Sequence, residues 1–205
     1  MTDPLRAVAD YYAEKLRANG PGAAGVDWNS AESQALRFRE LSRLLPAEGS
    51  FSVLDVGCGT GALVDFLAAE GWRFSYWGCD VSDAMLQVAR RLHAGRPDVR
   101  FAARAEDAPP CDFAFASGIF NVKLDADDDA WSRHMEATVR LMARQGLRGI
   151  AFNALSVYSD PGKRRADLHY ADPLKWFDFC KREISTSVAL LHDYPLWEFT
   201  LLVRR

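Results

Sequence analysis

The sequence predicts an α/β protein whose doubly wound, mostly parallel sheet has helices on both faces and ends in an antiparallel hairpin. From residue 51 onward, short apolar runs alternate with amphipathic stretches, a pattern typical of strand and helix units that build a parallel sheet. A glycine-rich turn at 57–61 follows the first apolar run directly, as in strand-to-helix corners that bind nucleotide-type ligands. A chain of 205 residues is expected to form one domain, 1–205, because such a chain buries roughly 70% of its unfolded surface.

The N-terminal segment, residues 1–46, is expected to form a helical cap or lid on the core sheet domain, residues 51–205. Apolar residues at helical spacing predict two helices in it, at 4–18 and 30–45. The loop between these helices is rich in glycine and contains one large aromatic side chain, Trp28. We therefore expect this loop to form part of the lid over a binding site.

The remaining strands and helices follow from the change between short apolar runs and helical periodicity. Strands are expected near 51–56, 74–79, 98–102, 112–117 and 148–153, and helices near 60–70, 82–95, 128–145 and 173–183. Asp172 and Pro173 supply an N-cap and a first-turn proline for the last of these helices. The final runs, STSVALLHDY and PLWEFTLLVRR, are joined around Asp193, Tyr194 and Pro195, which is short enough to require antiparallel pairing.

Composition and charge limit the kinds of binding partner that the chain is expected to have. A formal net charge of −3 provides no broad basic surface for phosphates, so we expect a small-molecule substrate and no nucleic acid. The four cysteines have no metal-ligand spacing, which predicts reduced thiols and no metal. The sequence has neither a signal-peptide core nor an uninterrupted apolar span, so a cytoplasmic protein without a membrane partner is expected.

Two acidic residues give the glycine turn its expected chemistry. Asp55 lies two residues before the first glycine in VLDVGCGTG, where a carboxylate would repel the pyrophosphate of a dinucleotide. This argues against a nicotinamide-dependent dehydrogenase and favours a cationic cofactor without phosphate, such as S-adenosylmethionine. Asp80 ends the second strand, 19 residues after Gly61, where a carboxylate can accept both ribose hydroxyls of an adenosine.

The motif VLDVGCGTG, followed by GCDVSDAML, resembles the first two motifs of class I S-adenosylmethionine-dependent methyltransferases. The resemblance covers residues 51–153 firmly and extends more loosely to the C-terminus. It implies S-adenosylmethionine as cofactor, a seven-stranded sheet and methyl transfer as activity.

The resemblance also implies which residues contact the cofactor. They are Asp55, Gly57, Cys58, Gly59, Asp80, Val81, Met85, Ala105, Glu106, Ser117 and Gly118. Met85 or Leu86 would pack on the adenine, and Glu106 is favoured over the Ala105 backbone and Asp107 because Arg104 stands where the family often has an acid. Arg37 could bind the cofactor's carboxylate through a bidentate fork, with a solvated helix face as its alternative.

The acceptor side is less determined. Tyr12, Trp28, Asn153 and Tyr158 are expected to shape the acceptor pocket, with ordinary packing as the alternative for each aromatic side chain. Asn121 and Tyr170 are the candidates for a catalytic role. The remaining residues considered are Tyr11, His169 and the neighbours His192 and Asp193 at the hairpin turn, for which turn chemistry is favoured over a general base. The acidic run at 125–129 suits a helix N-terminus, and magnesium binding, as in catechol-type family members, is its alternative.

Three functions stay open. The sequence SGIF after the fourth strand lacks the Asn- or Asp-Pro-Pro-aromatic signature of nucleic-acid amino methyltransferases, and no paired-glutamate loop of arginine methyltransferases is present. Transfer of a methyl group to a small molecule is therefore expected. The alternatives are non-methyl chemistry, such as cyclisation that releases methylthioadenosine, and a non-catalytic S-adenosylmethionine-binding module. Monomer and homodimer both remain open.

Overall fold

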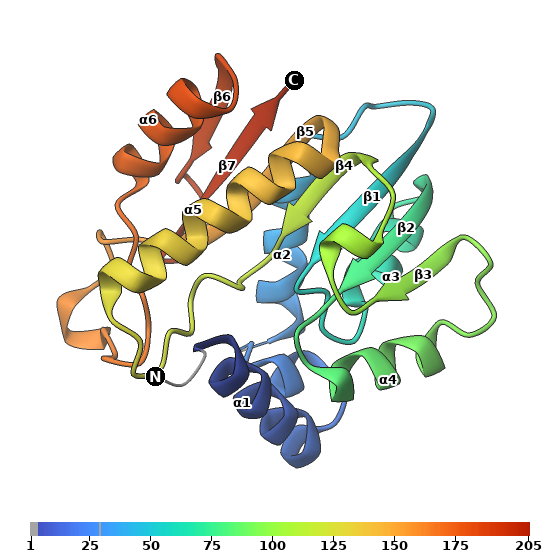
Figure 1. Ribbon diagram of the computed structural model, residues 1–205, viewed down its shortest axis with the longest axis horizontal. Helices are drawn as coiled ribbons and strands as arrows, with labels where there is room; N and C mark the ends of the chain where they lie inside the picture. The colour runs from blue at the N-terminus through green and yellow to red at the C-terminus, as the bar shows by residue number, and fades with distance from the viewer. Residues whose placement is uncertain (1–3, 29) are drawn as a thin grey trace.

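The computed structural model describes residues 4–28 and 30–205 and contains one seven-stranded sheet (Figure 1). The strands are β1 (Ser50–Val56), β2 (Arg73–Cys79), β3 (Val99–Ala102), β4 (Cys111–Ala116), β5 (Gly146–Leu155), β6 (Ser187–Leu191) and β7 (Glu198–Arg204). Their order is β3-β2-β1-β4-β5-β7-β6. β7 is antiparallel to both of its neighbours and the other pairs are parallel, which confirms the predicted fold class and C-terminal hairpin.

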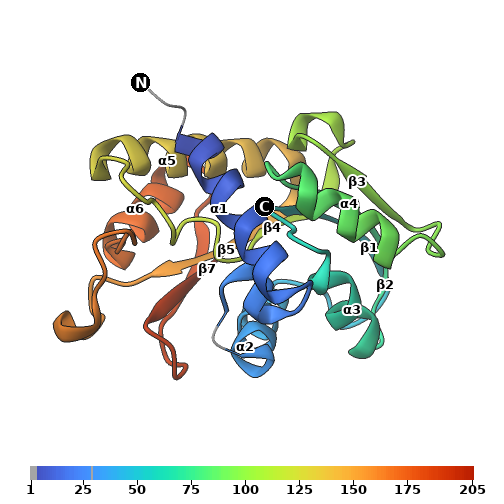
Figure 2. The same cartoon turned by 90° about the horizontal axis from the view of Figure 1, so that it is seen from below.

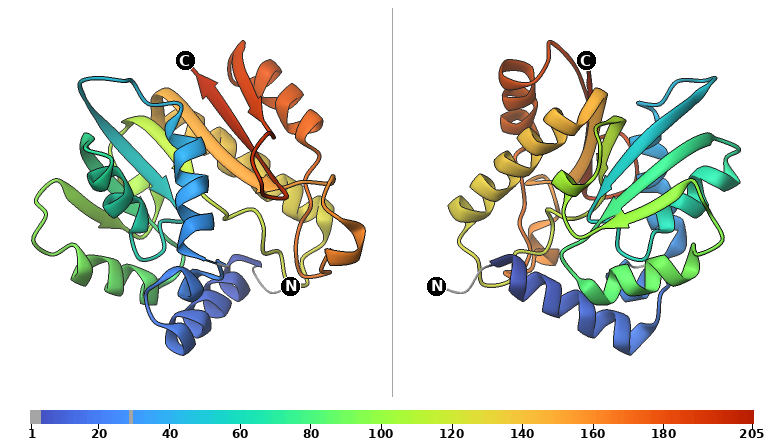
Figure 3. Two further views of the ribbon diagram at one scale, coloured as in Figure 1. Left: turned by 180° about the vertical axis from the view of Figure 1, so that it is seen from behind. Right: turned by 45° about the vertical axis from the view of Figure 1, so that its right-hand side comes forward.

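Helices cover both faces of the sheet. They are α1 (Pro4–Asn19), α2 (Ala31–Ser42), α3 (Ala62–Ala69), α4 (Asp83–Leu92), α5 (Asp128–Gln145) and α6 (Pro173–Glu183), with short 3-10 helices at Ala23–Val26, Ala105–Asp107 and Pro161–Lys163. One core cluster joins α2, α3 and α4 to one face through Leu41, Leu67 and Leu86. The other cluster joins α5 and α6 to the opposite face through Met135 and Trp176. Figure 3 shows these two helical layers from behind and from the side.

Capping residues explain where several helices begin. The Ser30 side chain accepts a hydrogen bond from the Ser33 amide at the start of α2. Asp172 likewise accepts from the first-turn amides of α6, with Pro173 at the first helical position. The Asp172 N-cap confirms the sequence prediction. Each of the two caps supplies an acceptor to amides that no helical carbonyl can reach.

The parts of the N-terminal segment occupy two different places. α2 lies on a face of the sheet with Phe38 and Leu41 buried in the core. α1 instead crosses the carboxyl ends of the parallel strands and contacts α4, as the view from below shows (Figure 2). In α/β sheets this edge is where ligands bind, so α1 and the short helix after it lie over the expected site.

The connection between β6 and β7 is longer than the turn expected from the sequence. It spans residues 192–197, because pairing ends at Leu191 and resumes at Glu198. His192 and Asp193 are exposed in it, whereas Tyr194 is buried and its hydroxyl bonds to Thr200 at 2.9 Å.

Among the described residues, no helix has the length and apolarity needed to cross a membrane.

Candidate active site

A cavity of about 290 Å³ lies at the carboxyl ends of β1, β2 and β4, under α1, close to the lower end of the roughly 300–1,000 Å³ typical of small-molecule sites. It lies at the point where the strand order reverses between β1 and β4, which is the expected position of a ligand in a doubly wound sheet. Eleven of the twelve residues expected to contact the cofactor line it: Asp55, Gly57, Cys58, Gly59, Asp80, Val81, Met85, Ala105, Glu106, Ser117 and Gly118.

The glycine turn after β1 is folded tightly against the end of β2. The amides of Gly57 and Cys58 both donate to the Cys79 carbonyl, at 2.7 and 3.0 Å. Gly57 has φ +75°, and a Cβ atom built on it would lie 2.1 Å from the Ile119 side chain. Only glycine accommodates both the backbone conformation and this approach. The turn therefore places bare backbone at the wall of the cavity.

Asp80 ties the glycine turn to the strand end. One carboxylate oxygen accepts from the Gly59 amide and the other from the Ser82 amide, each at 2.8 Å. Burial raises the pKa of Asp80, and these two amides lower it in part. A carboxylate has about four acceptor positions, so two remain for hydroxyl donors of a ligand. This geometry suits the two hydroxyls of a ribose.

Asp55 is a buried acid at the floor of the cavity. Its side chain is 3% exposed, and it accepts a hydrogen bond from the Tyr76 hydroxyl at 2.7 Å. Burial raises the pKa of Asp55 from 3.8 to about 7; the Tyr76 hydrogen bond lowers it and the neighbouring Asp80 raises it. No lysine or arginine pairs with Asp55 or Asp80 in the described part of the chain. Two carboxylates without a cationic partner favour a cationic ligand.

The rest of the lining suits the other parts of an adenosine-type ligand. Met85 lines the cavity with its side chain 1% exposed, whereas Leu86 belongs to the core cluster on the sheet face. Of the two residues that could pack on an adenine, the structure thus places Met85 at the cavity. Ser117 Oγ is buried and has no hydrogen-bond partner among the described residues. Such an orphaned hydroxyl at a cavity wall can bond to a ligand.

Trp28 forms the wall opposite the glycine turn. A Cβ atom built on Gly118, which has φ +76°, would lie 2.1 Å from Cη2 of the Trp28 indole. The indole therefore packs directly on the Gly118 turn at the end of β4. Tyr12, from α1, lines the same cavity. These two are the predicted acceptor-side residues that the structure brings to the cavity.

Arg37 lies behind Trp28, outside the set of lining residues. Its guanidinium carbon is 3.9 Å from the centre of the indole ring, and its Nε and Nη2 donate to the Glu198 carboxylate at 2.8 and 2.6 Å. The alternative of a solvated helix face was wrong, because Arg37 is 6% exposed. The local sequence pattern around Arg37 predicts an exposed side chain, because its partner Glu198 lies 161 positions away along the chain. Its predicted contact with the cofactor's carboxylate stays a prediction.

Four other predicted residues lie outside the cavity wall. Asn153 and Asn121 are buried behind Gly118 and bond to Glu198. Tyr158 is 58% exposed and its ring lies against that of His192. The Tyr170 hydroxyl accepts from the Arg165 amide in the loop before α6. The structure therefore places no side chain of these four where it would touch a ligand in the cavity.

One helix supplies cavity residues that sequence reasoning did not include. Trp131, His134, Thr138 and Leu141 line the cavity from α5. The Trp131 indole donates to the Phe120 carbonyl at 2.9 Å, and its ring lies 5.1 Å from the His134 ring. Their spacing of three or four residues marks one helix face. That periodicity shows in the sequence, but it does not reveal that the face borders a cavity.

The acidic run before α5 is accounted for by local contacts. Asp127 accepts from the amides of Asp129 and Ala130 as the N-cap of the helix. Asp128 lies 3.0 Å from the His169 ring nitrogen, and His169 is not among the residues that line the cavity. Among residues 4–28 and 30–205, no group of three or more His, Cys, Asp or Glu side chains could hold a metal ion. The four cysteines are unpaired and buried.

Comparisons with known proteins agree with this geometry. The sequence profile of the family described as "Methyltransferase domain" matches residues 53–146. The chain is 48% identical over 163 residues to the methyltransferase Rv1506c of Mycobacterium tuberculosis, covering 80% of this chain and 98% of that protein. It is also 38% identical over 85 residues to a ubiquinone biosynthesis O-methyltransferase of Paracidovorax citrulli, covering 38% of this chain and 34% of the relative.

Solved structures share the fold at low sequence identity. Magnesium protoporphyrin IX methyltransferase from Synechocystis PCC 6803, with bound S-adenosylmethionine, superimposes with a TM-score of 0.65 at 13% identity, covering 100% of this chain and 99% of that one. The N-methyltransferase NodS from Bradyrhizobium japonicum WM9, in complex with S-adenosylhomocysteine, gives a TM-score of 0.65 at 15% identity, covering 99% and 98%. Both are similar to this chain in the course of the sheet and its helices.

Proposed function

The chain belongs to the class I S-adenosylmethionine-dependent methyltransferase family, and we propose that it methylates a small, largely apolar acceptor bound between α1 and α5. The observation that carries the proposal is the pair of buried carboxylates, Asp55 and Asp80, in the lining of a cavity whose other walls are mostly apolar. When bound, S-adenosylmethionine supplies a methyl group on an electrophilic sulfonium. The roles below are those of the chain's own residues.

We assign the residues at the carboxyl ends of β1, β2 and β4 to the cofactor. Asp80 would accept the ribose hydroxyls with its two unused acceptor positions, and Met85 would pack on the adenine. Asp55 would balance the cationic end of the cofactor, because a buried carboxylate gains most from a cationic ligand. Ser117 would offer its unpartnered hydroxyl at the end of β4.

We assign the apolar walls to the acceptor. Leu5, Val8 and Tyr12 on α1 face the cavity together with Ile119 and Trp131. Such walls exclude water and align the acceptor, and alignment is the main requirement of an in-line methyl transfer. A large polar acceptor such as a nucleic acid would find few hydrogen-bond partners there.

His134 is the candidate for removing a proton from the acceptor. It is the one imidazole among the described residues that line the cavity, and imidazole is the commonest general base in enzymes. Its ring lies 5.1 Å from the Trp131 indole ring. We therefore assign it a role where the acceptor atom must lose a proton.

The test begins with the full-length protein and the cofactor alone. Calorimetry should show binding of S-adenosylmethionine, and Asp80→Ala should weaken it by at least about tenfold, as loss of a charge-assisted hydrogen-bond acceptor does. A surface variant, Asp178→Ala, is the matched control because its carboxylate pairs only with exposed Arg182 in the described structure. Screening of apolar hydroxyl and amine compounds for S-adenosylhomocysteine release then identifies acceptors.

Mass spectrometry of the cofactor separates the remaining alternatives. If methylthioadenosine accumulates without any acceptor, the protein uses the cofactor for non-methyl chemistry and the methyl-transfer proposal is wrong. If the protein binds the cofactor yet no compound in a broad panel yields S-adenosylhomocysteine, the non-catalytic module gains support. If wild-type protein does not bind S-adenosylmethionine at all, the assignment of the cavity fails.

A further inference from the structure

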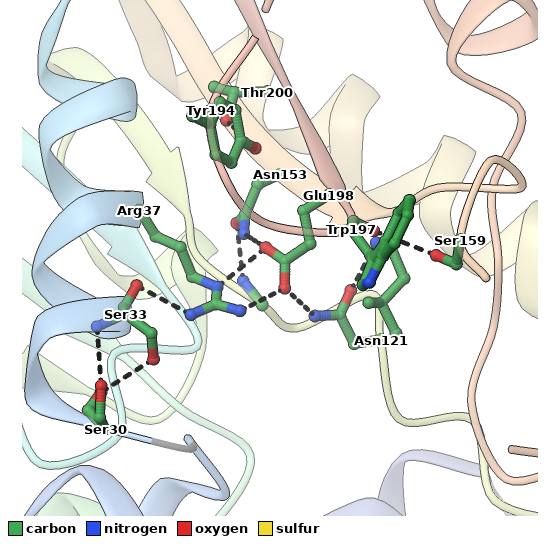
Figure 4. Close-up of polar contacts among 12 residues, drawn as sticks. Ser30, Ser33, Arg37, Asn121, Asn153, Ser159, Tyr194, Trp197, Glu198 and Thr200 are labelled. Carbon is green, nitrogen blue, oxygen red and sulfur yellow. Dashed lines mark hydrogen bonds and ion pairs between the residues drawn. The ribbon is translucent and has the colours of Figure 1, made fainter. Parts of the chain in front are cut away.

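Four buried polar side chains form a hydrogen-bonded cluster (Figure 4) that contacts Trp28 and Gly118 in the cavity wall. They are Arg37 on α2, Asn121 in the loop after β4, Asn153 on β5 and Glu198 on β7, with exposed fractions of 6, 6, 0 and 2%. We call them the Glu198 cluster. They come from segments up to 161 positions apart. Burying a charged pair in a core is costly, so this arrangement calls for a reason other than stability.

Glu198 is the centre of the cluster. Its two carboxylate oxygens accept the bidentate fork of Arg37 at 2.6 and 2.8 Å. Asn153 Nδ2 donates to Oε2, and Asn121 Nδ2 donates to Oε1 at 3.4 Å. Figure 4 shows all three donors converging on this one carboxylate. Each other member of the cluster therefore loses a partner if Glu198 is changed.

The cluster reaches the cavity wall by two routes. Arg37 holds its guanidinium 3.9 Å from the centre of the Trp28 indole, with its Nη1 fixed by the Ser33 carbonyl at 2.8 Å. Asn153 accepts from the Gly118 amide at 2.9 Å and so fixes the turn at the end of β4. Trp28 and Gly118 are the two residues that pack on each other at that wall. The positions of Trp28 and of Gly118 therefore both depend on Glu198.

We propose that Glu198 is a positioning residue for the cofactor site, acting on Trp28 through Arg37 and on the Gly118 turn through Asn153. The proposal rests on the cofactor assignment made above. Glu198 lies outside the motifs at 53–61 and 78–86 and does not line the cavity. Glu198 fixes two segments that belong to different parts of the chain, the loop before α2 and the loop after β4.

Charge gives Glu198 a second effect on a cationic ligand. The Arg37 guanidinium carries a positive charge, and Glu198 neutralises it behind the Trp28 indole, 3.9 Å from the ring centre. Two like unit charges about 10 Å apart, at an effective dielectric constant near 20, repel by the equivalent of roughly tenfold in affinity. Without the Glu198 carboxylate, the unpaired guanidinium behind this wall would therefore disfavour a cationic ligand to that order. Neutral S-adenosylhomocysteine would not feel this repulsion. The ratio of the two affinities therefore reports on the charge.

The first measurement is hydrogen–deuterium exchange on the ligand-free full-length protein. Glu198→Gln should raise exchange by about tenfold in segments 20–28 and 117–121, because local opening becomes easier once the wall is released. The matched control is Tyr194→Phe, which removes an equally buried hydrogen bond to Thr200 on the same hairpin but leaves the Glu198 cluster intact. In the control, exchange of both segments should stay within about twofold of wild type.

The second measurement compares affinities for S-adenosylmethionine and S-adenosylhomocysteine. In Glu198→Gln both should weaken, and S-adenosylmethionine should weaken about tenfold more, from the uncompensated Arg37 charge. The double variant Arg37→Gln with Glu198→Gln leaves no unpaired charge in the Glu198 cluster, so it keeps the protein folded if the single variant does not. It should restore the ratio of affinities, while segment 20–28 stays fast-exchanging because no guanidinium covers Trp28.

The possible results separate the explanations. If Glu198→Gln exchanges like Tyr194→Phe in both segments, Glu198 does not position the wall and the inference is wrong. The inference is also wrong if the affinities for S-adenosylmethionine and S-adenosylhomocysteine fall equally and follow the overall stability of each variant. That result would mean that Glu198 only stabilises the core. If wild-type protein binds neither ligand, the cofactor assignment fails, whereas the exchange data still decide whether Glu198 holds the two segments.

Discussion

Replacing Asp55 with asparagine should make the ligand-free protein more stable at alkaline pH. The Asp55 carboxyl is buried, and its pKa is raised from 3.8 to about 7. A raised pKa in the folded state means that the folded protein holds a proton that the unfolded chain has released. The contribution of this acid to stability is therefore full below pH 4 and is lost as the pH rises through 7. At one pKa unit per about 1.4 kcal/mol, a shift of roughly three units costs up to about 4 kcal/mol above pH 8.

Asparagine keeps the shape of the side chain and can still accept the hydrogen bond that the Tyr76 hydroxyl donates. Urea unfolding of wild type and Asp55→Asn at pH 5 and pH 8 measures the effect. We expect the variant to exceed wild type by roughly 2–4 kcal/mol at pH 8, and this advantage to be about 2–3 kcal/mol smaller at pH 5. The same variant should lose affinity for S-adenosylmethionine at pH 8, because the cation no longer meets a carboxylate.

The ligand gives an independent check on the same protonation. Since Asp55 is protonated below about pH 7 in the ligand-free protein, binding of a cationic cofactor should release a proton and strengthen from pH 6 to pH 8. Calorimetry in buffers of different ionisation enthalpy counts that proton. The reasoning is refuted if the stability gain of Asp55→Asn is the same at pH 5 and pH 8 and wild-type binding releases no proton.

Three further substitutions test the walls of the cavity. Gly118→Ala should destabilise the fold by roughly 1–3 kcal/mol and weaken cofactor binding, since its Cβ would lie 2.1 Å from Trp28; Gly162→Ala, where the nearest atom is 3.6 Å away, is the control, and equal thermal shifts would contradict the argument. Asp80→Asn should cost about 1–3 kcal/mol in urea unfolding because one of two backbone amides loses its acceptor; unchanged stability would show that these bonds matter little. His134→Ala should lower kcat by about 100-fold or more for acceptors that must lose a proton, with cofactor affinity unchanged by calorimetry; an unchanged kcat would remove His134 from the mechanism.

The sequence predicts the fold and the cofactor motifs well because both depend on local patterns. Alternation of apolar runs and helical periodicity identifies all seven strands and six long helices to within a few residues. Asp55, Gly57 and Asp80 are recognised from short motifs, and β1 and β2 then bring them together because the two strands pair in register from Ser50 to Val56. Local chemistry and nearest-neighbour pairing are enough to assemble that half of the site.

The other half of the site depends on contacts that no local pattern encodes. The sequence predicts a strand that ends at Asn153, whereas β5 continues to Leu155. The Asn153 side chain bonds to Glu198 and does not line the cavity. Arg37 and Glu198 meet only because α2 packs across β5 and β7. From the local sequence alone, Arg37 and Glu198 are each typical of a charged residue on the surface of a helix or strand. Only the topology of the closing hairpin makes them partners.

This division explains why the acceptor is the part of the function that short motifs leave undetermined. The carboxylates come from β1 and β2 and can be recognised in any chain that keeps the motif. The opposite wall comes from α1, the loop around Trp28 and one face of α5, so its shape depends on how distant segments pack. Glu198 joins one of those segments, the loop around Trp28, to the turn after β4 through a buried charge network. A change in acceptor preference is therefore expected to follow substitutions in the α1 and α5 faces, while substitutions in the Glu198 cluster should affect how firmly the wall is held.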